Sequence, residues 1–207
     1  MRLLIESQYL PPICYFSTLL HFDEVVVEKY EHYQKQTYRN RCYVNTSNGP
    51  DILIVPLTAK HGKVLIKDIR IDYSQKWLNG HWRTIQSAYG KAPFFEYYAT
   101  DFHDILFQKH DFLYDLNFSL LTMCLKWLRY NIPVTETSIY EKAVNEDVID
   151  FRSVINPKKE EGGNRFFKSV AYHQVFGSKF VNNLSIVDLV FCEGPGAMSI
   201  VRASATK

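Results

Sequence analysis

Residues 3–27, LLIESQYLPPICYFSTLLHFDEVVV, carry the pattern of a complete strand–helix–strand unit. The unit opens with the apolar run Leu3–Ile5 and closes with the β-branched run Val25–Val27, each of strand length. Between them, Pro11 and Pro12 precede apolar residues spaced by three or four positions, which is typical of a helix that starts at a proline. We expect the second strand to return parallel to the first through a right-handed crossover, so that both strands end at one edge of a sheet.

The rest of the chain alternates further strand and helix patterns. Strands are expected at 41–45, 52–57, 66–71 and 134–139, the first three as an antiparallel extension, and helices at 74–90, 93–107, 113–130 and 185–194. Ser74 and the pair Ser185 and Asp188 are placed to cap two helices, which Gly90 and Gly194 would end. The expected fold class is α/β, with a single mixed-sheet domain flanked by helices over 3–196. Its N-terminal unit is Rossmann-like, and a flexible tail is expected at 197–207.

Composition narrows the class of protein. The 207 residues are 46% hydrophobic and 22% charged with 9 glycines, which excludes collagen, a disordered chain and a coiled coil. Because 24 Lys+Arg nearly balance 22 Asp+Glu, nucleic acid is not expected as a partner. No apolar run reaches the roughly 18 residues of a membrane span, and the N-terminus does not resemble a secretion signal. Four widely spaced cysteines favour buried thiols, so a cytoplasmic protein of open oligomeric state is expected.

The loop after the first strand is a candidate anion site. Gln8 and Tyr9 would lie between the end of a strand and the start of a helix, where unpaired N–H groups favour phosphate. Alternatively, these two side chains only satisfy backbone groups of the loop. Glu28 follows the second strand about 20 residues later, at the offset where an acidic group can accept a hydrogen bond from a ribose hydroxyl, although the glycine fingerprint of dinucleotide folds is absent.

A second candidate is the aromatic and basic run at 33–41. It offers forked cationic donors beside phenol rings, which suits a phosphate or carboxylate joined to a base or sugar. Arg39 and Arg41 would project from one face of an extended segment. The alternative is a solvated edge strand with cationic guards. The expected ligand-binding residues here are Tyr33, Lys35, Tyr38, Arg39, Asn40 and Arg41.

His81 is the candidate general acid or base, with Glu28 as a second catalytic candidate and Arg83 as a nearby ligand-binding residue. A histidine on a helix beside Trp82 is alternatively a packed residue that makes one hydrogen bond. The other histidines lack the spacing of zinc ligands, so neither a metal nor a cofactor is expected.

Several blocks occur in a specific order. They are Gln8–Pro12 with Tyr15–Phe16, then Glu28, Tyr33–Arg41, His81–Ile85, Pro93–Phe95, Asn183–Leu189 and Glu193–Pro195. Together, over about residues 3–196, they resemble the WbqC-like protein family in the compact form found in Bacteroidetes-type bacteria. The resemblance implies a bacterial cytoplasmic protein associated with surface-polysaccharide gene clusters, without an established reaction. Many members have His-Gln-Pro-Asn before Tyr-Leu-Pro, where this chain has Ile5–Gln8, so no role for that imidazole carries over.

Two functions follow as hypotheses. The first is a transferase-type enzyme acting on a small phosphate-bearing precursor of surface glycan or lipid, such as a nucleotide sugar. The second is a non-catalytic binding or scaffold protein that uses its aromatic and basic surface. A concave pocket lined by these residues favours the first and a flat patch the second. The loop 156–165, with its Gly162–Gly163 pair, is predicted to close over the ligand.

Overall fold

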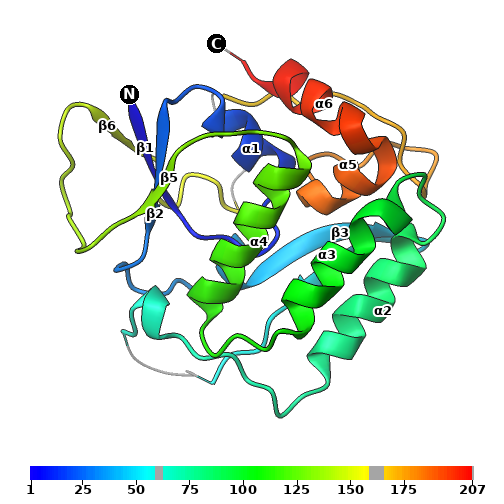
Figure 1. Ribbon diagram of the computed structural model, residues 1–207, viewed down its shortest axis with the longest axis horizontal. Coiled ribbons are helices and arrows are strands. Elements are labelled where there is room, and N and C mark those ends of the chain that lie inside the picture. Colours follow the sequence, from blue (N-terminus) through cyan, green and yellow to red (C-terminus); the bar gives the residue numbers. More distant parts are fainter. Residues whose placement is uncertain (59–62, 159–165, 207) are drawn as a thin grey trace.

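The structure is a computed structural model that describes residues 1–58, 63–158 and 166–206. Its main sheet contains four parallel strands in the order β5-β2-β1-β6 (Figure 1). The strands are β1 (Arg2–Glu6), β2 (Glu24–Glu28), β5 (Val134–Glu136) and β6 (Val148–Asp150). The α/β fold class expected from the sequence is therefore confirmed.

The predicted strand–helix–strand unit is present. Helix α1 (Ile13–Leu19) connects β1 to β2, and the two strands pair in parallel with Glu6 beside Glu28 at their carboxyl ends. Numbered along the chain, the four strands of this sheet follow the order 3-2-1-4. The strand order thus reverses direction beside β1. In open α/β sheets, ligands bind outside the carboxyl ends of the strands at such a switch point, which here lies between β1 and β6.

A separate antiparallel hairpin consists of β3 (Arg41–Thr46) and β4 (Gly49–Ile54). Gly49 adopts φ +96° at the turn, a conformation that other residues rarely adopt. The hairpin agrees with the predicted strands, but it does not extend the parallel sheet. The strand expected at 66–71 is wrong, because Ile66–Asp68 forms a 3₁₀ turn (η2) that buries Ile66.

The helices surround the hairpin and one side of the main sheet. In Figure 1, α4 (Leu113–Trp127) lies beside the parallel sheet, with α3 (Phe95–Phe107) and α2 (Trp77–Tyr89) beyond it. Gly90 is the C-cap of α2 as expected, but Lys76 rather than Ser74 is its N-cap residue. None of the helices that the structure describes is long and apolar enough to span a membrane.

The C-terminal region differs most from expectation. Helix α5 (Ile186–Glu193) ends at Gly194 as predicted, and residues 197–207 were expected to form a flexible tail. Instead, Ala197–Ser204 forms helix α6, which packs on α1 and buries Val201 completely. The lid prediction for 156–165 depends on Lys158, Lys159, Gly162 and Gly163. Residues 159–165 lie outside the described residues, so that prediction stays open.

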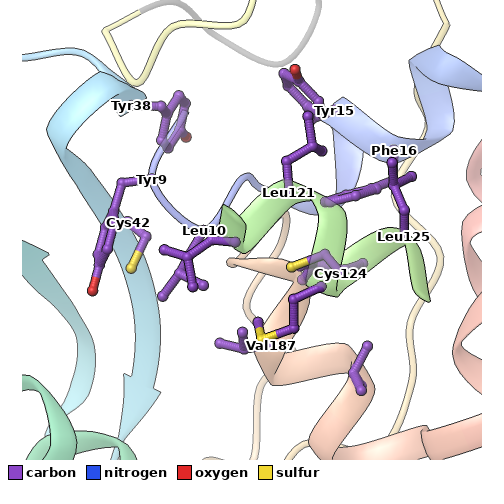
Figure 2. Close-up of a cluster of buried hydrophobic side chains, with 14 of the residues drawn as sticks. Tyr9, Leu10, Tyr15, Phe16, Tyr38, Cys42, Leu121, Cys124, Leu125 and Val187 are labelled. Carbon is purple, nitrogen blue, oxygen red and sulfur yellow. The ribbon is translucent and has the colours of Figure 1, made fainter. Parts of the chain in front are cut away.

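The core lies where α1, α4, α5 and the hairpin meet. Figure 2 shows Leu10, from the segment after β1, between Cys42 of β3 and Cys124 of α4. All four cysteine side chains are buried thiols, as the sequence suggested. The aromatic content therefore serves mainly to fill this core and to line its margins, because Tyr9 and Tyr15 are fully buried.

Candidate functional site

A cleft of about 310 Å³ opens at the switch point of the parallel sheet. We name it the switch cleft, and its walls come from the segments that follow β1 and β6, from the hairpin, and from the segment before α5. The lining combines aliphatic, aromatic and amide side chains, and it consists of Cys14, Tyr38, Tyr43, Pro50, residues 154–157, Phe167 and residues 181–184. Such a mixture of apolar surface with a few polar groups is typical of small-molecule sites.

Residues 183–184 accept hydrogen bonds from the backbone N–H groups at the start of α1. The backbone N–H of Cys14 donates to the Asn183 Oδ1 atom at 2.9 Å, and that of Ile13 donates to the Leu184 carbonyl at 3.0 Å. Asn183 holds φ +50°, a conformation that asparagine tolerates better than most residues. The N–H donors that the expected anion site at this helix start would use already have acceptors, so the structure does not favour an anion there.

The buried carboxylate of Asp188 stabilises this wall of the cleft through hydrogen bonds on the side away from the cleft. Asp188 is fully buried and accepts hydrogen bonds from the hydroxyls of Tyr89 and Tyr172. Gln174 donates to the same carboxylate, and its amide pairs with both backbone groups of Val181 at 2.9 Å. Burial raises the pKa of Asp188, although the three donors oppose that shift.

The expected capping box of α5 is consequently wrong. The Ser185 hydroxyl donates to the Leu10 carbonyl at 2.8 Å instead of capping its own helix, and the Asp188 carboxylate is occupied by the tyrosines. Both side chains join distant segments, because burial of the helix start places other donors and acceptors within reach.

Charged side chains gather at the carboxyl ends of β1 and β2, below the cleft wall at 154–157. Glu6 accepts from the Gln8 amide at 2.7 Å and from the Ser153 backbone N–H at 2.8 Å. Arg39 donates to the Ser153 hydroxyl at 3.1 Å, and Gln8 also contacts the Ile155 carbonyl. This network ties the segment after β6 to the strand ends, and it includes Gln8 from the predicted site residues.

Arg39 was expected to be exposed, but it is 1% exposed and paired with Glu31. Its Nε and Nη2 atoms lie 2.7 and 2.6 Å from the two Glu31 oxygens. Burial raises the pKa of Glu31, and the bonds from Arg39 oppose that shift. Arg39 turns inward because residues 38–40 form a 3₁₀ turn (η1) rather than an extended segment, so this arginine supports the site instead of facing a ligand.

Both carboxylate oxygens of Glu28 also accept hydrogen bonds from the protein. One of its oxygens accepts from the Tyr30 backbone N–H and the Thr137 hydroxyl, both at 2.8 Å. The other accepts from Arg152 at 2.8 Å, and Glu28 is 0% exposed. In this arrangement Glu28 anchors the connections that follow β2, β5 and β6.

His81 lies in a separate buried group with Tyr9. The Tyr9 hydroxyl is 2.9 Å from His81 Nδ1, and the Trp77 ring packs against the imidazole edge. Burial lowers the pKa of His81 from 6.5 to about 4, so the ring is neutral near neutral pH. These contacts correspond to the packed alternative for His81, and they leave Tyr9 with no side-chain surface for a ligand.

The other predicted residues fall in two shallower depressions. Tyr33, Lys35, Asn40 and Arg41 share one of about 330 Å³ beside the end of β4. Arg83 lies on α2 in the other, with Asp51 of the hairpin turn region. The structure thus brings four residues of the 33–41 run together, places Tyr38 in the switch cleft, and separates Arg83 from both.

Sequence reasoning missed the residues that build the cleft walls, chiefly Asn183, Asp188, Arg152 and Ser153. Ser153 has φ +62°, and its backbone N–H and hydroxyl join Glu6 to Arg39. No local pattern marks Asn183 and Ser153, because the partners named here lie more than 100 positions away. Arg152 does have a local partner, Asp150, but its bond to Glu28 joins residues 124 positions apart. The one available signal was Glu6, an acidic residue at the end of an apolar strand.

Comparisons with known proteins give one family and one relative. A model of the WbqC-like protein family matches residues 6–171. The chain is 30% identical over 144 residues to "Uncharacterized protein Rv1507c" from Mycobacterium tuberculosis. That similarity covers 68% of this chain but only 61% of the relative, so the chain spans about three fifths of its length. No solved structure matches this chain.

Proposed function

The chain belongs to the WbqC-like protein family, and we propose that it binds a phosphate-bearing, hydroxyl-rich small molecule in the switch cleft. The observation that carries the proposal is the coincidence of this cleft with the switch point of a parallel sheet. Tyr38 and Tyr43 offer ring faces for a sugar or base, and the amides of the lining offer donors and acceptors for hydroxyl groups.

The first candidate activity is a transferase that acts on a glycosyl precursor of surface glycan or lipid, such as a nucleotide sugar. Tyr38 and Tyr43 line a concave cleft rather than a flat patch, which supports a small-molecule site over a protein-binding surface. The biosynthetic setting rests on the family resemblance alone.

The second candidate is a binding protein without catalysis. Among the described residues that line the switch cleft, none is an Asp, Glu or His, the side chains most often used as general acid or base. Glu6 and Glu28 lie behind the wall with their oxygens occupied. This observation favours recognition of a ligand over proton transfer to it.

Two measurements test these proposals. A thermal-shift screen with nucleotide sugars, nucleotides and sugar phosphates should find a ligand that raises the melting temperature, because a ligand bound only by the native state stabilises it. Mass spectrometry of the protein incubated with that ligand and acceptor sugars or prenyl phosphates then separates the two candidates. Transfer product supports the enzyme, and binding without product supports the binding protein. A panel without any stabilising ligand would contradict both.

A further inference from the structure

The outer face of the β3–β4 hairpin connects the switch cleft to the depression at Arg41. Arg41 and Tyr43 lie on the same face of β3, because side chains two residues apart along a strand point the same way. Their partners across the hairpin are Ile54 and Ile52, which are 44% and 40% exposed. This face therefore points outward, with Tyr43 at the cleft and Arg41 at the depression.

The spacing suits one extended ligand. Residues two apart on a strand are separated by roughly 6.6 Å, so a single ligand that carries both a ring and a phosphate can reach Tyr43 and Arg41 together. Tyr38 packs edge-on against Tyr43 with ring centroids 5.9 Å apart, so both rings border the end of the cleft that leads toward Arg41.

Arg41 has no acceptor within the part of the chain that the structure describes. Its Nε atom is buried without a hydrogen-bond partner, and no described carboxylate forms an ion pair with it. By contrast, Arg39 and Arg152 are each paired with buried glutamates. A buried N–H without an acceptor is costly, so an anionic oxygen at Arg41 would satisfy a group that the protein leaves unsatisfied.

Asn40 supplies a hydrogen-bond acceptor without a partner beside Arg41. Its Nδ2 atom donates to the Val55 carbonyl at 3.0 Å, which fixes the orientation of the amide. The Oδ1 atom is then directed away from Val55 and is buried without a partner, although Asn40 lines the depression and is only 6% exposed. A cation beside an unused acceptor matches a phosphate with a neighbouring hydroxyl group.

We propose that Arg41, with Asn40 beside it, forms an anion subsite for the phosphate of a ligand whose glycosyl group occupies the switch cleft. The inference rests on the proposed function and extends it, since it names phosphorylated sugars as the ligand class. Phosphate oxygens accept from the Arg41 guanidinium, and a ligand hydroxyl donates to Asn40 Oδ1. This location for the phosphate differs from the start of α1, where the N–H groups already donate to residues 183–184.

Calorimetric titration of four variants with inorganic pyrophosphate and with UDP-glucose tests the subsite. Arg41→Gln should weaken both ligands about tenfold or more, because it removes a charge-assisted hydrogen bond. Tyr43→Leu should weaken UDP-glucose but not pyrophosphate. Arg202→Gln, at an exposed position of α6, is the matched control and should change neither affinity. Arg41→Lys keeps the charge without the fork and should fall between wild type and Arg41→Gln.

The outcomes separate the two proposals. Pyrophosphate affinity that is unchanged in folded Arg41→Gln, or no pyrophosphate binding by wild type, overturns the subsite. If Arg41→Gln weakens pyrophosphate while Tyr43→Leu leaves UDP-glucose unchanged, the subsite stands and the cleft assignment fails. UMP and farnesyl phosphate, titrated in the same way, show whether the phosphate comes from a nucleotide or a lipid, and Arg41-dependent binding of either supports the subsite.

Discussion

Arg39 and Arg41 show how two residues of the same type and neighbourhood acquire different roles. Arg39 lies in the 3₁₀ turn η1, and its side chain points inward. It forms a salt bridge with Glu31 through two hydrogen bonds, and both side chains are almost completely buried. Arg41 begins β3 and faces outward, where no described carboxylate pairs with it. Removing one member of a buried pair leaves the other charge uncompensated. We therefore infer that Arg39 stabilises the folded site and that Arg41 is available to contact a ligand.

The Tyr9–His81 contact predicts a pH dependence of stability. His81 has a pKa of about 4 in the folded protein, against 6.5 ordinarily, so the unfolded chain binds a proton that the folded one does not. The resulting stability is fully present above pH 6.5 and is lost as the pH falls from 6.5 toward 4. Urea unfolding should therefore show a loss of about 2 to 3 kcal/mol from this group between about pH 7 and about pH 4.5.

His81→Asn isolates this contribution, since asparagine keeps an acceptor for Tyr9 and does not titrate. The variant should lose less stability on acidification than wild type. Equal losses in the two proteins would show that His81 is accessible and charged at low pH, which would restore it as a candidate acid or base.

At the scale of elements, α1 depends on a segment about 170 residues away in the chain. Pro12 cannot donate and offers no side-chain cap, so the first N–H groups of the helix use Asn183 and Leu184. Ser185 and Pro12 also form an antiparallel bridge. The same contacts that begin α1 therefore form one wall of the switch cleft.

Replacing Asn183 should separate the hydrogen bond from the backbone conformation. Asn183→Gly keeps the left-handed φ and loses only the bond to Cys14, so the free energy of unfolding should fall by about 1 kcal/mol. Asn183→Ala also introduces backbone strain and should cost more, about 2 kcal/mol in all. Denaturant unfolding measures both, and equal costs would show that the left-handed conformation is not maintained in solution.

At the scale of the whole molecule, the C-terminal region closes onto the N-terminal unit. Helix α6 packs on α1, and the Lys168 backbone N–H donates to the Ser204 carbonyl at 2.8 Å. The family match ends at residue 171, although residues 181–184, before α5, complete the cleft. The segment before α5 and the start of α1 therefore line the same cleft.

A charge placed in α6 tests whether the helix is docked. Val201 is 0% exposed, so Val201→Asp should lower the free energy of unfolding by at least about 2 kcal/mol, through lost apolar burial and a desolvated carboxylate. Ser199→Asp introduces the same residue on the exposed side of the first turn and should stay within about 0.5 kcal/mol of wild type. Small effects of both substitutions in urea unfolding would indicate the flexible tail that the sequence suggested.

Local pattern was sufficient for much of the fold. The strand–helix–strand unit, the hairpin with its Gly49 turn and the amphipathic helices α2 to α4 could be predicted, because spacing and turn chemistry act within a few residues. The prediction of a strand at 66–71 was wrong because the isoleucines of this segment can be buried from a 3₁₀ turn and a loop as well as from a strand.

The sequence by itself determined the α/β class, the parallel unit at 3–27 and the family, since each depends on residues close together or on ordered blocks. Only the tertiary structure decided which polar groups remain available to a ligand. Arg39, Glu28 and the start of α1 looked open in the sequence, yet each meets a partner brought by another segment. Arg41 keeps no such partner in the described chain, because whether a donor is satisfied depends on which distant acceptors the fold brings within about 3 Å of it.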